Sequence, residues 1–213
     1  MTIYPLFYYH LYRIANQPTA ADVVNSLDAP TLTNILLTYG EESKAKRIAQ
    51  TIVQYRQNYR PIETTKELAT VVSFAFTHRE ADKRQDSLGR HASVATKTFL
   101  ALRIFVNNEL NELSTGLKTV EPFVRPDTGK LAVLSFHSME DRIVKRFMQG
   151  RNVAEKAKTL RQRVAEGKDM AESIIEGGGN KWRMGKSVLT PSEEEIGMNP
   201  RSRSAKLRVG VKV

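Results

Sequence analysis

The 213-residue sequence contains no cysteine, and this absence excludes disulfide bonds and thiolate metal sites. No apolar run reaches the roughly 18 residues of a membrane-spanning helix, so we expect no membrane partner. The histidines are few and scattered without the spacing of metal ligands, which argues against a structural zinc site. They are His10, His78, His91 and His137.

Residues 1–17 lack the features of a targeting signal. The segment is aromatic and carries only one charged residue, Arg13. It has neither the charged n-region nor the small-residue cleavage site of a secretory signal. It is also poor in the arginine and serine that are typical of transit peptides. We interpret residues 1–17 as a poorly specified tail, with weak organelle targeting as the alternative.

The sequence has two strand candidates, and neither is followed by a glycine-rich loop. Residues 130–136 form a short apolar run, and residues 207–213 alternate between apolar and polar positions. The glycine run at 177–179 follows no predicted strand, so we do not interpret it as a phosphate-binding loop. Two strands do not make an independently stable sheet. We therefore expect further strands from a longer protein, or from another chain that associates through exposed sheet edges or as a dimer.

Positive charge is in excess and is unevenly distributed. The net charge is +10, and residues 18–122 carry 13 basic and 12 acidic residues. Residues 123–213 carry 19 basic and 11 acidic residues, partly in a basic insertion at about 150–190. A basic surface on one part of a chain is expected of a nucleic-acid-binding protein. A soluble basic protein or a basic loop would give the same charge, and the charge alone favours neither interpretation.

Residues 18–122 have the pattern of a helical subdomain. Thr19 or Asp22 can cap a first helix, and Thr64 with Glu67 forms a capping-box pattern. Apolar residues recur at helical spacing between 45 and 53. Another apolar stripe predicts one helix of about seven turns. It comprises Ala95, Phe99, Leu102, Val106, Leu110, Leu113, Leu117 and Val120.

The segment KLAVLSFHSMEDRIVKRF, residues 130–147, predicts a strand, a polar turn and a helix. Ser138 stands three residues before Asp141, which resembles a capping box at the start of the helix. The turn places His137 and Ser138 at the carboxyl end of a strand, where α/β folds bind ligands.

Four segments together resemble the MraW/RsmH family of S-adenosylmethionine-dependent methyltransferases, which modify the N4 of a cytosine in small-subunit rRNA. They are YGEESKAKRIA (39–49), HASVATKTFLALRIFVNNEL (91–110), GKLAVLSFHSMEDRIVKRF (129–147) and NPRSRSAKLRV (199–209). The resemblance runs from about residue 18 to residue 209. The phrase RIFVNNELNELSTGLK (103–118) is similar to the eukaryotic, mitochondrial branch.

The resemblance implies an α/β fold: the carboxyl-terminal part of a Rossmann-like methyltransferase sheet plus an inserted helical subdomain. Residues 18–122 would be the helical RNA-recognition insert, and residues 123–213 the carboxyl-terminal part of the methyltransferase domain. The family's cofactor-binding glycine loop and its Asp-Leu-Gly segment have no counterpart here. We therefore expect S-adenosylmethionine in the parent family, inactivity of this truncated chain, and no cofactor-binding residue within it. The alternative is a non-enzymatic RNA-binding or ribosome-assembly remnant.

The resemblance also points to candidate site residues. His137 and Ser138 would line the substrate cleft around a flipped cytosine, and the alternative is a structural role in capping the helix. Arg201 and Arg203 would contact RNA phosphates, with a solvated turn as the alternative. Asp141 is assigned a structural role.

Four more basic residues are candidates for RNA contact: Lys145, Arg146, Lys97 and Arg103. For these, a plain solvated helix face explains the charge equally well. Trp182 would more often anchor a loop than stack on a base. We expect small-subunit rRNA as the partner and a mitochondrial location, with the cytoplasm as the alternative.

Overall fold

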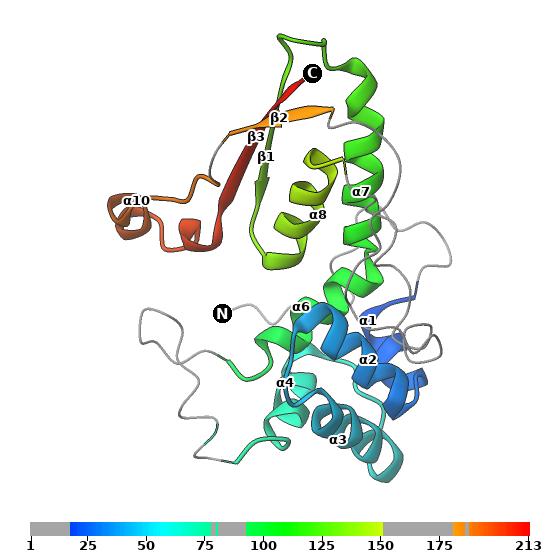
Figure 1. The fold of residues 1–213 in the computed structure, drawn as a ribbon. Coiled ribbons are helices and arrows are strands. Elements are labelled where there is room, and N and C mark those ends of the chain that lie inside the picture. Colours follow the sequence, from blue (N-terminus) through cyan, green and yellow to red (C-terminus); the bar gives the residue numbers. More distant parts are fainter. Residues whose placement is uncertain (1–17, 78–79, 81–92, 151–180, 186–187) are drawn as a thin grey trace. The chain divides into compact units, whose positions relative to one another are not determined.

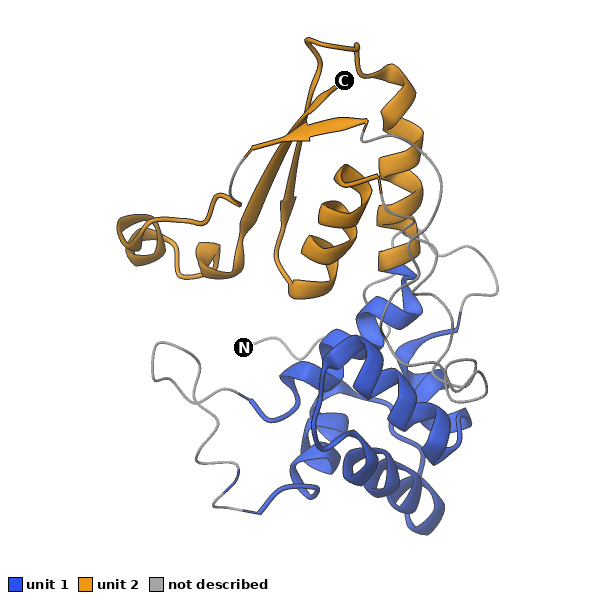
Figure 2. Ribbon diagram, viewed as in Figure 1, with its two compact units in different colours: residues 1–109 blue, residues 110–213 orange. Residues whose placement is uncertain are grey.

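A computed structural model describes residues 18–77, 80, 93–150, 181–185 and 188–213, and Figure 1 draws the fold. The chain forms two compact units, residues 1–109 and residues 110–213 (Figure 2). The sequence placed the boundary near residue 122. The compact units divide about one helix earlier, because the last predicted helical segment packs with the sheet, and the boundary of the RNA-recognition insert stays a prediction.

The described part of the first unit is helical. Its elements are α1 (Ala20–Ser26), α2 (Ala29–Gly40), α3 (Ala45–Asn58), α4 (Thr65–Ser73) and α6 (Thr96–Val106). The Thr19 hydroxyl accepts the Asp22 amide at 3.0 Å, and the Asp22 carboxylate accepts the Thr19 amide at 2.7 Å. Thr64 and Glu67 form the same reciprocal cap at the start of α4. Both predicted caps are confirmed.

The predicted apolar stripe of α3 forms part of the core of this unit. Ala45, Ile48, Ala49 and Ile52 are buried, and they pack with apolar residues of α1, α2, α4 and α6. Helices α2 and α6 approach closely at Gly40, where a Cβ atom would lie 2.8 Å from the Lys97 carbonyl oxygen. The absence of a side chain there lets the two backbones meet.

The prediction of a single long helix over 95–120 is wrong. The structure has two helices, α6 ending at Val106 and α7 (Glu109–Val120). Asn108 has a φ of 53°, in the left-handed region that asparagine tolerates better than most residues. The Asn107 amide still donates to the Arg103 carbonyl, and the chain then leaves the helical path.

The second unit combines helices with a small sheet. After α7 come the 3₁₀ turn η1 (Glu121–Phe123), β1 (Lys130–Ser135), α8 (Ser138–Met148), β2 (Trp182–Met184), α10 (Glu193–Met198), η3 (Ser202–Ser204) and β3 (Lys206–Lys212). Strand β3 is central and pairs antiparallel with both β1 and β2. This mixed helix-and-sheet fold confirms the predicted class, and β2 is a strand that the sequence analysis missed.

One face of the sheet is covered by helices α7 and α8. Leu117 of α7 and Val144, Phe147 and Met148 of α8 form a buried cluster with Trp182 of β2. The Trp182 side chain is 1% exposed, and its ring centroid lies 5.9 Å from that of Phe147. Trp182 therefore anchors the core, which favours its structural interpretation over stacking on a base.

The other face of the sheet is open among the described residues. Leu134 is 54% exposed and pairs across the ladder with Leu207, which forms an isolated bridge with the 56%-exposed Leu189. Of the two edges of β1, only the one facing β3 is paired within the described part of the chain. Exposed strand edges can pair with another strand, and exposed apolar faces can pack against another surface.

Candidate functional site at the carboxyl end of strand β1

His137, not Ser138, caps helix α8. The His137 backbone is extended, and its Nδ1 accepts the Glu140 amide at 3.4 Å. The Glu140 carboxylate accepts the Phe136 amide at 2.8 Å and the His137 amide at 3.3 Å. The capping box is thus shifted by one residue from the predicted pair of Ser138 and Asp141. Ser138 becomes the exposed first residue of the helix.

The pKa of the Glu140 carboxylate is strongly lowered in this turn. Partial burial raises its pKa, but the hydrogen bond with His137 and the Phe136 amide outweigh burial and lower the pKa to about 2. The His137 Nε2 atom lies 3.2 Å from Glu140 Oε1. Because Nδ1 accepts an amide hydrogen, a neutral imidazole carries its proton on Nε2.

Asp141 joins α8 to the central strand. Its carboxylate accepts two hydrogen bonds from the Arg208 guanidinium, at 2.7 Å from Nε and 3.0 Å from the second nitrogen. The Lys206 ammonium lies 3.8 Å away. The hydrogen bond from Arg208 is the main cause of the lowered pKa of Asp141. This contact fixes the turn at His137 relative to β3, and it agrees with the structural role assigned to Asp141.

Arg201 and Arg203 lie at the same end of the sheet as His137. The ladder pairs Ser135 with Lys206, so the residues just before β3 adjoin those just after β1. Arg201 is exposed, and Arg203 is half-buried in η3. Asn199 shapes this turn, since its side chain accepts the Arg201 amide at 3.2 Å. The register thus places the segments that carry four of the predicted site residues at the same end of the sheet.

The sequence model of the MraW methylase family matches residues 12–213. The chain belongs to this family. The match begins six residues before the segment in which the sequence analysis found a resemblance, and it includes part of the tail assigned to residues 1–17.

The chain is also similar to individual members with known names. A human 12S rRNA N(4)-cytidine methyltransferase METTL15 is 49% identical over 210 residues, covering 94% of this chain and 51% of the relative. A Drosophila melanogaster probable methyltransferase-like protein 15 homolog is 41% identical, covering 91% and 54%. A Rickettsia prowazekii ribosomal RNA small subunit methyltransferase H is 40% identical, covering 92% and 58%. The chain thus spans about half the length of the curated relatives it matches.

The remaining predicted RNA contacts lie elsewhere in this MraW-family chain. Lys145 and Arg146 belong to the last turn of α8, away from the His137 cap. Lys97 donates to the Glu41 carbonyl at 3.0 Å, and Arg103 forms a two-point ion pair with Glu109. These two contacts lie within the first unit and have structural roles of their own. RNA contact by all four residues stays a prediction.

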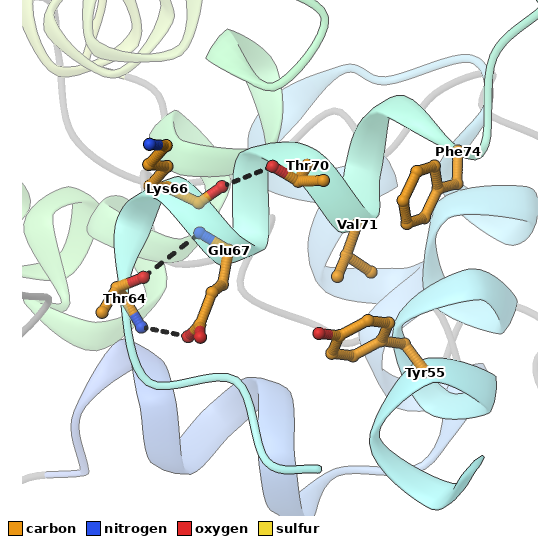
Figure 3. A pocket seen from close by; sticks show the side chains of 7 residues that line it. All are labelled: Tyr55, Thr64, Lys66, Glu67, Thr70, Val71 and Phe74. Atoms are coloured by element: carbon orange, nitrogen blue, oxygen red, sulfur yellow. Dashed lines mark hydrogen bonds between the residues drawn. The ribbon is translucent and has the colours of Figure 1, made fainter. Parts of the chain in front are cut away.

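The first unit carries a shallow hollow of about 420 Å³ (Figure 3). Val71 and the Tyr55 and Phe74 rings make its apolar part, and the cap of Thr64 with Glu67 closes one side. No predicted site residue lines this hollow, and we assign it no function.

MraW-family methyltransferases depend on S-adenosylmethionine, and none of the described strands is followed by a glycine-rich loop for that cofactor. The family resemblance calls for a glycine-rich loop after a strand. Here β1 passes through Phe136 and His137 into α8 without a glycine, and β2 is followed only by Gly185. Within the described residues, no three His, Asp or Glu side chains are grouped as metal ligands. No helix in this part of the chain has the length and apolarity needed to cross a membrane.

Proposed function

We propose that this chain is the RNA-facing portion of a methyltransferase that transfers a methyl group from S-adenosylmethionine to the N4 of a cytosine in small-subunit rRNA. The observation that carries the proposal is the grouping of His137, Ser138, Arg201 and Arg203 at the carboxyl end of β1. The names of the human and Rickettsia relatives supply the reaction and its RNA.

In this proposal the residues of the strand end position RNA and perform no proton transfer. Enzymes that modify a base generally take it out of the stack, and Arg201 is placed to hold a phosphate beside such a base. The His137 Nδ1 atom is already occupied by the Glu140 amide, so it is not an acceptor for the protons of the cytosine amine. His137 therefore shapes the floor of the cleft, and Ser138 is the exposed polar group beside it.

We also infer that the chain by itself does not bind S-adenosylmethionine and is inactive alone. The lack of a glycine loop after the described strands supports this inference. Calorimetric titration of the purified chain with S-adenosylmethionine tests it. No heat at millimolar cofactor is expected, whereas saturable binding would contradict the inference and call for a methyl-transfer assay. RNA binding without cofactor binding is also what a non-enzymatic ribosome-assembly remnant would show.

The open edge of β1 and the exposed Leu134 and Leu189 support association of the sheet with further strands, including those of a second copy. Sedimentation velocity at several chain concentrations tests this. A sedimentation coefficient that rises with concentration is expected, and a constant monomeric value would contradict it.

We propose a mitochondrial location, with the cytoplasm as the alternative. The higher identity to the human relative, 49% against 40% for the Rickettsia relative, supports the eukaryotic branch that the sequence resembles. Microscopy of the tagged protein beside a mitochondrial marker tests this location.

A further inference from the structure

The opposite end of β1 carries a second group of positive charges. Three segments meet there: the loop at 121–130, the start of β2 and the end of β3. The Lys212 amide donates to the Gly129 carbonyl at 3.0 Å, and the Val213 amide donates to the Lys181 carbonyl at 2.9 Å. We call this region the amino-end surface. It is formed by Phe123, Arg125, Lys130, Lys181, Arg183 and Lys212.

Cations outnumber carboxylates on the amino-end surface. Residues 121–130, 181–185 and 209–213 carry five basic side chains and two acidic ones, Glu121 and Asp127. Glu121 is partly neutralised, because its carboxylate lies 3.4 Å from the Lys181 ammonium. The Lys212 ammonium donates to the Glu121 carbonyl oxygen at 2.8 Å.

The strand register places two of these cations on one face. Val211 pairs with Lys130 on one side and with Arg183 on the other, so the three residues form a row across the sheet. Residues directly opposite each other in a ladder share a face, so Lys130 and Arg183 flank Val211 on the face that the helices leave open. Their Cα atoms are separated by two strand spacings, about 10 Å. Lys130 and Arg183 are exposed and make no ion pair with another described residue.

An exposed aromatic ring lies in the loop that carries Arg125 and leads into Lys130. Phe123 ends the 3₁₀ turn η1 and is 83% exposed. Burial in the core explains Trp182, but nothing among the described residues covers Phe123 in the same way. Arg125, two residues later, is also exposed. A cationic surface with an exposed ring is the combination that binds single-stranded nucleic acid, since phosphates meet the cations and a base stacks on the ring.

We propose that the amino-end surface binds RNA, with backbone phosphates on Arg125, Lys130 and Arg183 and an unpaired base on Phe123. The surface lies about 20 Å along β1 from His137, so it is a contact separate from the strand-end site. The proposal rests on the proposed function, because an RNA substrate makes RNA the expected polyanion here. RNA is favoured over an acidic protein surface because the loop that carries Arg125 also offers an exposed ring as a stacking partner.

The test measures binding of the full chain to a fluorescent single-stranded polyuridine oligonucleotide by anisotropy over a range of salt concentrations. In Arg125→Gln/Lys130→Gln the affinity should fall, and the salt slope should decrease by about 0.7 for each phosphate that the variant no longer neutralises. In Phe123→Ser the affinity should fall roughly fivefold or more with an unchanged salt slope. The matched comparison is Lys46→Gln/Lys66→Gln, which removes the same charge from two exposed lysines of the first unit. The Arg125/Lys130 variant should lose more affinity than this variant does, and an equal or smaller loss would contradict the amino-end surface.

A further variant, Arg201→Gln/Arg203→Gln, separates this inference from the proposed function. If it binds RNA normally while the Arg125/Lys130 variant binds weakly, the proposal of RNA contacts at the strand end is wrong and the proposal of the amino-end surface is supported. The reverse result overturns the amino-end surface and leaves the strand-end site intact. An unchanged chain that fails to bind at low salt refutes both. The fluorescence of Trp182, the single tryptophan, verifies that each variant keeps the core of the second unit.

Discussion

Replacing Asp141 by asparagine tests the contact that joins α8 to β3. The Asp141 and Arg208 side chains are only 12% and 13% exposed, and they share two hydrogen bonds. Asparagine has nearly the same shape but no charge. Its amide group would also direct a donor at the guanidinium, which has donors only. The variant therefore leaves the Arg208 charge without a counterion in a largely buried position.

The cost follows from the burial of the pair and its two hydrogen bonds. Removing one partner of a buried ion pair costs about 3–5 kcal/mol. The slight exposure of both groups reduces this value, and Lys206 adds little because its side chain is 40% exposed. We expect a loss of about 3 kcal/mol in the free energy of unfolding of the second unit. Domains of this size have only about 5–15 kcal/mol of stability in total, so the effect is easily measured.

Urea unfolding followed by Trp182 fluorescence measures this loss, because Trp182 lies in the core of the affected unit. The urea midpoint should fall with little change in slope. Arg208 lowers the pKa of Asp141 below its ordinary 3.8. The stabilisation is thus present above that value and is lost as the pH falls through the lower native pKa. The stabilities of the variant and the unchanged chain should converge in acid.

The double-mutant cycle of Asp141→Asn with Arg208→Gln provides the control. The double variant should destabilise the unit by less than the sum of the two single variants, with a coupling of about 1.5 kcal/mol or more. Glu193→Gln, which removes an exposed carboxylate from the first turn of α10, should change stability by only a few tenths of a kcal/mol. A cost below about 0.5 kcal/mol for Asp141→Asn, or no coupling to Arg208, refutes the reasoning.

Three further substitutions probe the caps and the helix contact. Glu140→Gln should lower the free energy of unfolding by about 1 kcal/mol at neutral pH, after allowance for solvent screening. This difference should disappear in an acid titration between pH 4.5 and about 2, because the pKa of Glu140 is lower in the folded state than in the unfolded state. Thr64→Ala should cost about 1 kcal/mol in urea melts followed by circular dichroism, whereas Thr64→Ser should cost much less. Gly40→Ala should lower the thermal unfolding midpoint despite the high helix propensity of alanine, because the new Cβ would lie 2.8 Å from the Lys97 carbonyl oxygen. An unchanged or higher midpoint would contradict the close approach of α2 and α6.

Local signals in the sequence predicted the parts of the fold that depend on neighbouring residues. The apolar stripe of α3 and the cap at Thr64 are examples, since helix caps act within one turn. The prediction of a helix across Asn107 and Asn108 was wrong, because the apolar spacing continues on both sides of the break. The pair of asparagines was the available signal. Strand β2 was not recognised, because three residues form a strand only through their pairing with β3.

The candidate site shows the same division between local and distant causes. His137 and Ser138 each precede an acidic residue by three positions, so the sequence allowed two registers for the cap. Glutamate is the preferred residue at the third helical position of a capping box, and Glu140 was therefore the signal for His137. Asp141 is unavailable as a capping group because Arg208, 67 residues away, takes its carboxylate. No local pattern predicts an interaction over that separation.

In both RNA contacts proposed above, positive charge at the ends of β1 binds RNA without taking part in methyl transfer. Neither Arg201 at one end nor Lys130 at the other has a contact that depends on a cofactor among those described, because the strand register places Lys130 and the Asn199 turn holds Arg201. RNA affinity of this chain should therefore be the same with and without S-adenosylmethionine. A methyltransferase portion and a ribosome-assembly remnant share that behaviour. Saturable cofactor binding in the titration would exclude the remnant, whereas the absence of heat is expected of both. The salt dependence of RNA binding is the measurement that maps the surface.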